Sequence, residues 1–225
     1  MPTRNLKFTA TPQHGKVSAI LNRPAEARAL LLLAHGAGTD MRHYFLEALS
    51  AALADKHIAT FRYNFPYKEK GGKGGPNGQA ILFETIRNAL AAAASAAPEL
   101  PLFAGGKSFG GRMTSLAAAP RPLPGVRGLV FFGFPLHPAG KPAIDRAAHL
   151  VEHELPLLFL WGPRDTLALP KLIQPIVAGL GARASLHEVA GADHSFKVLK
   201  RDTRTEADVV AELAQVTAAW IAERS

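Results

Sequence analysis

Short apolar blocks alternate with longer segments of mixed polarity along most of the chain. The apolar blocks are continuous, as expected of strands that are covered on both faces. They comprise residues 29–35, 58–63, 102–104, 126–133, 157–161 and 184–189. The segments between them are predicted as helices at 41–56, 79–97, 112–119, 143–151, 171–179 and 205–224. Strands that alternate with helices in this way predict an α/β fold with a mostly parallel sheet and helices on both faces.

The N-terminal part of the chain departs from this alternation. Two short strands are predicted at 6–9 and 16–21, joined by a turn and therefore antiparallel. With them the sheet has about eight strands. Asp40 is the expected N-cap of the helix 41–56. No repeat, linker or break in composition divides the chain, so a single domain over 1–225 is expected.

The composition is that of an ordinary globular protein, with 48% hydrophobic residues among 225. The absence of cysteine excludes disulfides, thiol catalysis and thiolate metal sites. Residues 1–10 contain no apolar signal core, and the longest apolar run, 29–34, is too short to span a bilayer. A soluble, cytoplasmic protein without a membrane partner is expected.

The formal net charge of +8 permits acidic partners, but lysine and arginine are spread along the chain, and nucleic-acid binding is not expected. One local cluster of lysines occupies 68–73, within a long segment rich in glycine and lysine, 64–78. A solvated loop is the better interpretation of this cluster, with a phosphate cradle as the alternative.

The segment 106–111, Gly-Lys-Ser-Phe-Gly-Gly, follows the strand 102–104 and precedes the helix 112–119. The order of strand, G-x-S-x-G and helix is typical of a nucleophile elbow. Gly106 and Gly110 are expected to flank Ser108 because a Cβ at either position would collide with a neighbouring strand or helix. The turn would also place Ser108 at a helix N-terminus, where negative charge is favoured.

A serine hydroxyl needs a base within hydrogen-bond reach, and the base needs an acid that fixes its tautomer. Asp165 follows the strand 157–161, and His194 follows the last strand, 184–189. Because ligands bind at the carboxyl ends of the strands in such sheets, Ser108, Asp165 and His194 are expected to meet there. Their order along the chain is that of the α/β-hydrolases, and the sequence predicts a catalytic triad.

Other assignments of these residue types are possible. Asp165 taken alone is better interpreted as a helix cap or a turn residue, and His194 could be a histidine of a surface loop. Asp193 is a second candidate acid, but neighbouring side chains in a loop usually diverge. His187 lies within a predicted strand, and His35 is assigned to shaping the turn that follows the strand 29–35.

The tetrahedral oxyanion requires two preorganised donors. The first is expected to be the N–H of Phe109, directly after the nucleophile. The second is expected from Ala37, where Gly36 and Gly38 let the main chain approach the substrate.

At these residues the chain resembles the α/β-hydrolase superfamily, and it is similar in size to its dienelactone-hydrolase-like members. More closely, it resembles a family of bacterial predicted hydrolases related to a testis-expressed protein and to a subunit of a chromatin-associated non-specific-lethal complex. The resemblance extends over about 30–220. The motifs that carry it are H-G-A-G at 35–38, G-G-K-S-F-G-G-R at 105–112, F-P-L-H-P at 134–138, W-G-P-R-D at 161–165 and A-D-H-S at 192–195.

The resemblance implies an α/β-hydrolase fold. Many hydrolases of this fold insert a lid before the strand 157–161, but the segment 134–156 is too short for a cap domain. An open site is therefore expected. The residues predicted to bind substrate are Gly36, Phe134, Pro135 and Leu136, with Phe109 and the segment 64–78 shaping the site.

The expected function is a cofactor-independent serine hydrolase that acts on a small-molecule acyl substrate: an ester, a thioester or a related compound. No metal is expected, because the histidines lack H-E-x-x-H or a similar spacing. A dienelactone hydrolase proper would carry a cysteine nucleophile, so that substrate is not implied. The alternative is a binding or scaffold protein that retains the fold, as the chromatin-associated relative suggests.

Overall fold

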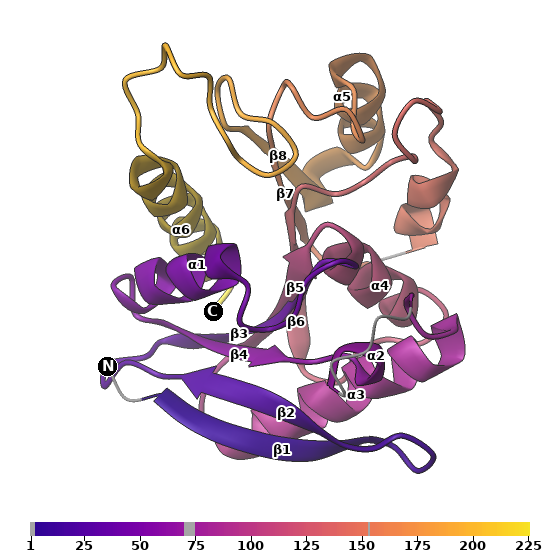
Figure 1. The fold of residues 1–225 in the computed structure, drawn as a ribbon, viewed down its shortest axis with the longest axis vertical. Helices are drawn as coiled ribbons and strands as arrows, with labels where there is room; N and C mark the ends of the chain where they lie inside the picture. Colours follow the sequence, from indigo (N-terminus) through magenta and orange to yellow (C-terminus); the bar gives the residue numbers. More distant parts are fainter. Residues whose placement is uncertain (1–2, 70–74, 153) are drawn as a thin grey trace.

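The computed structural model describes residues 3–69, 75–152 and 154–225. In these residues the chain forms one sheet of eight strands in the order β1-β2-β4-β3-β5-β6-β7-β8 (Figure 1). The strands are β1 (Thr3–Thr11), β2 (Gly15–Asn22), β3 (Ala29–Ala34), β4 (Ile58–Tyr63), β5 (Leu102–Lys107), β6 (Val126–Phe132), β7 (Leu157–Trp161) and β8 (Ala184–Glu188). β2 pairs antiparallel with β1 and β4, and all other pairs are parallel. The predicted mostly parallel sheet with an antiparallel N-terminal pair is confirmed.

Helices cover both faces of the sheet (Figure 1). They are α1 (Tyr44–Ala54), α2 (Pro66–Glu69), α3 (Gln79–Ala96), α4 (Phe109–Ala118), α5 (Pro170–Gly179) and α6 (Glu206–Ala222), with 3₁₀ turns at Asp145–Glu152 and Gly181–Arg183. α1 and α6 pack on one face, and α3, α4 and α5 pack on the other. Leu31 and Leu33 of β3 face the first group, whereas Leu30 and Leu32 face the second. A strand buried on both faces explains the continuous apolar run.

β5 is longer than predicted, because it continues past Ala104 through Gly105 and Gly106 to Lys107. Glycine normally weakens a strand, so a strand that continues through two glycines is not expected from the sequence. Here a Cβ at Gly105 would collide with the carbonyl group of Val130 on β6, and one at Gly106 with that of Ala34 on β3. The two glycines therefore let β5 fit closely between its neighbours up to the nucleophile.

The predicted N-cap of the first helix is wrong. α1 begins at Tyr44 with His43 at the N-cap position, and no side chain caps it. Asp40 instead accepts a hydrogen bond from the N–H of Arg42, 2.8 Å from its Oδ1, in a turn that precedes the helix. Asx turns of this kind compete with capping for the same residue types.

The predicted loop 64–78 contains the short helix α2, whose Glu69 accepts hydrogen bonds from the main-chain N–H and the hydroxyl of Ser18 on β2. Of the lysine cluster at 68–73, the part from residue 70 onward lies outside the described residues. Between β6 and β7, the described residues contain only the 3₁₀ turn Asp145–Glu152, so the predicted absence of a cap domain is confirmed. None of the helices in the described ranges has the length and apolar character needed to cross a bilayer.

Candidate active site

Ser108 lies between β5 and α4 in a strained conformation. Its φ of 51° and ψ of −115° are rare for a residue with a side chain. Gly110, on the α4 side, would place a Cβ against the carbonyl groups of Ala34 and His35, and Gly106, on the strand side, would place one against that of Ala34. The prediction that a Cβ at Gly106 or Gly110 would collide with its neighbours is confirmed. The turn leaves the serine hydroxyl at the carboxyl end of β5, beside the N-terminus of a helix.

The structure brings together the three side chains predicted as a triad. Nε2 of His194 lies 2.8 Å from Oγ of Ser108, and Nδ1 of His194 lies 2.7 Å from Oδ2 of Asp165. Each of the three follows the carboxyl end of a strand: Ser108 follows β5, Asp165 follows β7 and His194 follows β8. The chain thus forms a continuous hydrogen-bonded line from acid to base to hydroxyl.

Asp165 is held so that only one of its oxygens faces the imidazole. Its carboxylate is buried, and its Oδ1 accepts a hydrogen bond from the N–H of Leu167 at 2.7 Å. An ionised Oδ2 can only accept, so Nδ1 of His194 donates to it. Nε2 then carries the lone pair that faces Ser108, which is the tautomer that a general base requires.

The two competing side chains are engaged elsewhere. Oδ1 of Asp193 accepts from the N–H groups of Ser195 and Lys197, at 2.8 and 2.9 Å, and closes the loop that carries His194. His187 projects from β8 toward α6, where its Nε2 lies 2.8 Å from a carboxylate oxygen of Glu212. Neither contact leads toward Ser108.

His35 fixes the turn that follows β3. It is fully buried, and its Nε2 accepts a hydrogen bond from the N–H of Phe65 at 3.1 Å. Its Nδ1 therefore carries the proton and donates to the carbonyl of Gly36, 2.7 Å away. Burial lowers the pKa of His35 to about 4, so the imidazole is neutral near pH 7. This geometry agrees with a role in shaping the turn rather than in proton transfer.

The turn after β3 lies against the elbow. A Cβ at Gly36 would be 3.9 Å from the carbonyl oxygen of Lys107. Among the described residues, no acceptor takes the main-chain N–H of Ala37 or of Phe109. The hydroxyl of Tyr67 on α2 donates to the carbonyl of Ala37 at 2.9 Å, which fixes the peptide group between Ala37 and Gly38, next to the one that carries the Ala37 N–H. Burial raises the pKa of the Tyr67 phenol, so it remains a donor at neutral pH.

Three of the predicted substrate-binding residues, Phe134, Pro135 and Leu136, are buried. The ring of Phe134 packs on those of Phe131 and Phe159, with centroid distances of 5.2 and 5.8 Å. The contact of the three predicted residues with substrate, like that of buried Gly36, stays a prediction.

Two polar side chains contact the main chain of candidate site residues without any signal in the sequence: Tyr67 contacts Ala37, and Lys107 contacts His194. Tyr67 lies in a segment that predicts a loop, and Lys107 occupies the variable position of the elbow motif. No group of three or more histidine, aspartate or glutamate side chains that could hold a metal ion occurs in the part of the chain that the structure describes.

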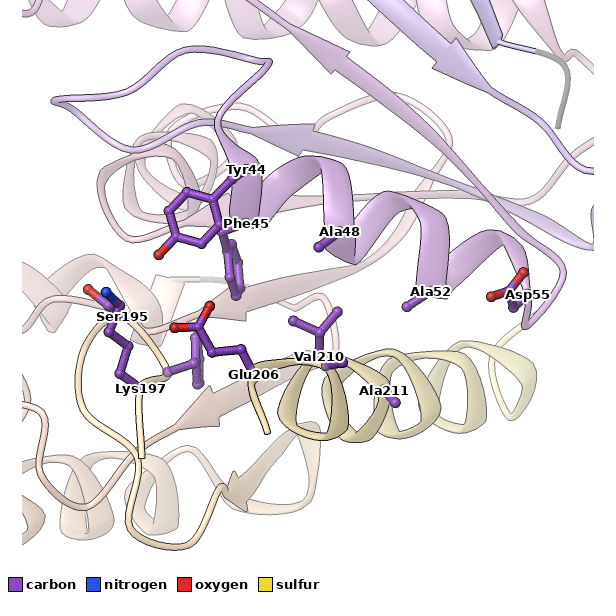
Figure 2. A pocket seen from close by; sticks show the side chains of 12 residues that line it. Tyr44, Phe45, Ala48, Ala52, Asp55, Ser195, Lys197, Glu206, Val210 and Ala211 are labelled. Atoms are coloured by element: carbon purple, nitrogen blue, oxygen red, sulfur yellow. The ribbon is translucent and has the colours of Figure 1, made fainter. Parts of the chain in front are cut away.

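A mostly apolar groove of about 400 Å³ runs between α1 and α6 (Figure 2). Its floor and walls are formed mainly by alanine, valine and aromatic side chains, among them Ala48, Val210, Phe45 and Phe196. Ser195 and Phe196 bring it next to the loop of His194, but neither Ser108 nor His194 lines it. The groove is therefore separate from the triad.

Residues 27–222 match the sequence family described as an alpha/beta hydrolase domain, and the chain belongs to this family. Several solved structures have a similar fold, and each match extends over nearly all of this chain and of the other protein. A dienelactone hydrolase from Anabaena variabilis has 18% identity and a TM-score of 0.76, covering 100% of this chain and 99% of its own.

Two further structures have similar coverage. The esterase domain of a Rhodothermus marinus protein has 19% identity and a TM-score of 0.73, covering 99% of each chain. XC6422 from Xanthomonas campestris, described as a serine hydrolase without lid, has 19% identity and a TM-score of 0.70, covering 98% of this chain and 96% of its own. At these identities the structures show a shared α/β-hydrolase fold.

Proposed function

We propose that this α/β-hydrolase is a serine hydrolase of esters, thioesters or related acyl compounds. The observation that carries the proposal is the hydrogen-bonded line from Asp165 through His194 to Ser108, with distances of 2.7 and 2.8 Å. A hydroxyl, a base with its lone pair directed at that hydroxyl, and a buried acid that fixes the base are the groups that acyl transfer requires.

In the proposed reaction, Oγ of Ser108 attacks the carbonyl carbon while Nε2 of His194 takes the hydroxyl proton. The N–H groups of Phe109 and Ala37 stabilise the oxyanion of the tetrahedral intermediate. His194 then gives the proton to the departing alkoxide or thiolate, which leaves an acyl group on Ser108. Water attacks the acyl-enzyme, His194 takes its proton and returns it to Oγ, and the carboxylic acid is released.

The substrate class follows from the nucleophile and from the relatives. The chain has no cysteine, so a cysteine-dependent dienelactone hydrolase is not proposed. Esterase is the activity in the name of the Rhodothermus marinus domain, and we extend it to this chain as part of the proposal. The motifs at 35–38, 105–112, 134–138, 161–165 and 192–195 support placing it among the bacterial hydrolases related to the testis-expressed and non-specific-lethal proteins.

A fluorophosphonate probe tests the proposal, because it reacts only with an activated serine. We expect the purified protein to be labelled at Ser108, as located by peptide mass spectrometry, and to hydrolyse p-nitrophenyl acetate. Denatured protein is the control for nonspecific labelling. A folded protein that takes no probe and hydrolyses no ester of any acyl length would instead support the non-catalytic binding or scaffold alternative.

Tyr67→Phe is expected to lower kcat about threefold to tenfold with little change in KM, the effect of losing one hydrogen bond. Phenylalanine fills the same space, but the carbonyl of Ala37 loses its donor. The peptide group between Ala37 and Gly38 is then held less firmly, and so is the adjoining peptide group that carries the proposed oxyanion N–H. Steady-state kinetics with p-nitrophenyl acetate measure this. Tyr44→Phe, at an exposed tyrosine of α1, is the matched control and should leave kcat unchanged. An unchanged kcat in Tyr67→Phe would argue against Ala37 as a donor.

Short acyl groups are expected to be hydrolysed at least as well as long ones. No cap domain covers the triad in the described residues, so a long chain gains little of the roughly 0.8 kcal/mol available for each buried CH₂. We expect kcat/KM for acetyl to butyryl p-nitrophenyl esters to exceed that for the palmitoyl ester. A steady rise from acetyl to palmitoyl would indicate a deep, closed acyl channel instead.

A further inference from the structure

Lys107 connects the nucleophile strand to the loop of the proposed base. It is the last residue of β5, directly before Ser108. Its Nζ donates a hydrogen bond to the main-chain carbonyl oxygen of His194, 2.6 Å away and 87 positions along the chain. A side chain adjacent to the nucleophile therefore contacts the main chain of the base itself.

The ammonium group of Lys107 lies among aromatic rings and main chain. Nζ is 5.3 Å from the ring centroid of Phe196 and 6.0 Å from that of Phe45, and these two rings stack on each other. A Cβ at Gly133 would be 3.1 Å from Nζ and 3.5 Å from Cε1 of the His194 imidazole. Nζ and the imidazole thus both lie close to Gly133, at the end of β6.

None of the ion pairs found among the described residues involves Lys107. Asp165 and Asp193 act on Lys107, but Oδ2 of Asp165 is paired with His194, and Oδ1 of Asp193 is bonded to main-chain N–H groups. Burial lowers the pKa of Lys107 to about 8, and the two carboxylates oppose this only in part. A partly buried ammonium without its own counter-ion is costly, and an apolar side chain would pack beside the rings at less cost. A role for the charge itself is therefore the better explanation.

The loop that carries His194 has no regular secondary structure. Between β8 and α6, residues 189–205 form neither helix nor strand. The imidazole must nevertheless stay within hydrogen-bond reach of a hydroxyl on β5. The contact from Lys107 joins the two parts directly, at the residue whose position matters.

We propose that Lys107 is a positioning residue whose ammonium group holds the main chain of His194 where the imidazole reaches Ser108. The inference rests on the proposed function, since it assigns the neighbour of the nucleophile a role in the same reaction. Because an ammonium donor forms a stronger hydrogen bond than a neutral amine, the effect depends on the protonation of Lys107.

The dependence on pH has a definite sign. Lys107 is charged below its pKa, so the contact is strongest at lower pH and weakens as pH rises through about 8. The charged groups that act on it are Asp165 and Asp193, while α1 and the loop after His194 present the uncharged rings of Phe45 and Phe196. We expect kcat of the wild-type protein to fall about threefold to tenfold above this pH, after subtraction of spontaneous ester hydrolysis.

Lys107→Met tests the role of the charge. Methionine keeps an unbranched apolar stem beside the rings but cannot donate a hydrogen bond. We expect kcat for p-nitrophenyl acetate to fall about tenfold to a hundredfold with little change in KM, and the decline near pH 8 to disappear. Lys197→Met, which removes the same charge from an exposed side chain of the same loop, is the matched control and should keep both the rate and the profile.

Lys107→Ala provides an independent readout, because propylammonium has the atoms that this change removes. Propylammonium should restore part of kcat, whereas 1-propanol, which is similar in size but uncharged, should not. Ser108→Ala with the same additives corrects for direct aminolysis of the ester.

The outcomes separate this proposal from the function on which it rests. If the wild-type protein neither takes the fluorophosphonate probe nor hydrolyses esters, the proposed function is wrong and the role of Lys107 falls with it. If the wild type is active but shows no decline above pH 8, the role of Lys107 alone is wrong. An active Lys107→Met variant with the wild-type kcat and profile, or an alanine variant that propylammonium does not rescue, would also overturn it.

Discussion

Ser108→Ala is expected to lower kcat for p-nitrophenyl acetate about 10³-fold or more, the loss typical of removing a triad nucleophile. The variant has no oxygen that can attack the carbonyl, and the remaining rate reflects only binding and the oxyanion donors. The change removes one atom of a partly buried residue, and the hydrogen bond of this atom is to His194. The positive φ at this position is as unfavourable for alanine as for serine. The melting temperature should therefore stay close to that of the wild type.

Ser195→Ala is the matched control, because Ser195 is an exposed serine directly after His194. It should keep its kcat and its labelling by a fluorophosphonate, whereas Ser108→Ala should lose both. A Ser108→Ala variant that retained most of the activity would exclude Ser108 as the nucleophile. Labelling at another serine would then identify the reactive residue.

The fold could be predicted in most of its outline because burial on both faces leaves a clear pattern. The run of β3 has to be apolar at every position, since Leu30 and Leu31 face opposite helix layers. The pattern fails where backbone packing outweighs residue preference. β5 continues through two glycines because only glycine fits between Ala34 and Val130, and Asp40 makes a local turn instead of capping α1.

The candidate site shows the same division. Ser108, Asp165 and His194 could be placed at one edge because each follows a predicted strand, and the parallel topology determines where strands end. The contacts of Tyr67 with Ala37 and of Lys107 with His194 join positions 30 and 87 residues apart. No pattern in the sequence around these four residues predicts such contacts. The burial of Phe134 likewise depends on its packing against Phe131 of β6 and Phe159 of β7, and an apolar loop sequence does not predict it.

Asp165→Asn is expected to lower kcat about 10³- to 10⁴-fold, the effect known for amide replacement of a triad acid. The structure supplies the reason. Oδ1 accepts from the N–H of Leu167, so the amide oxygen of asparagine would keep that place and turn its NH₂ group toward Nδ1 of His194. Nδ1 would then have to accept, which puts the proton on Nε2. An N–H facing Ser108 cannot take the hydroxyl proton.

Asp193→Asn tests the same chemistry one residue away from the base. Its Oδ1 accepts from the N–H groups of Ser195 and Lys197, and an amide oxygen can accept both. The loop should keep its shape, and kcat should change less than about twofold, as for most substitutions that leave such contacts intact. Kinetics of both variants with p-nitrophenyl acetate, beside their melting temperatures, decide the assignment. A large loss in Asp193→Asn together with a small one in Asp165→Asn would make Asp193 the acid. The loop would then have to turn in solution, since its carboxylate is bonded to its own main chain here.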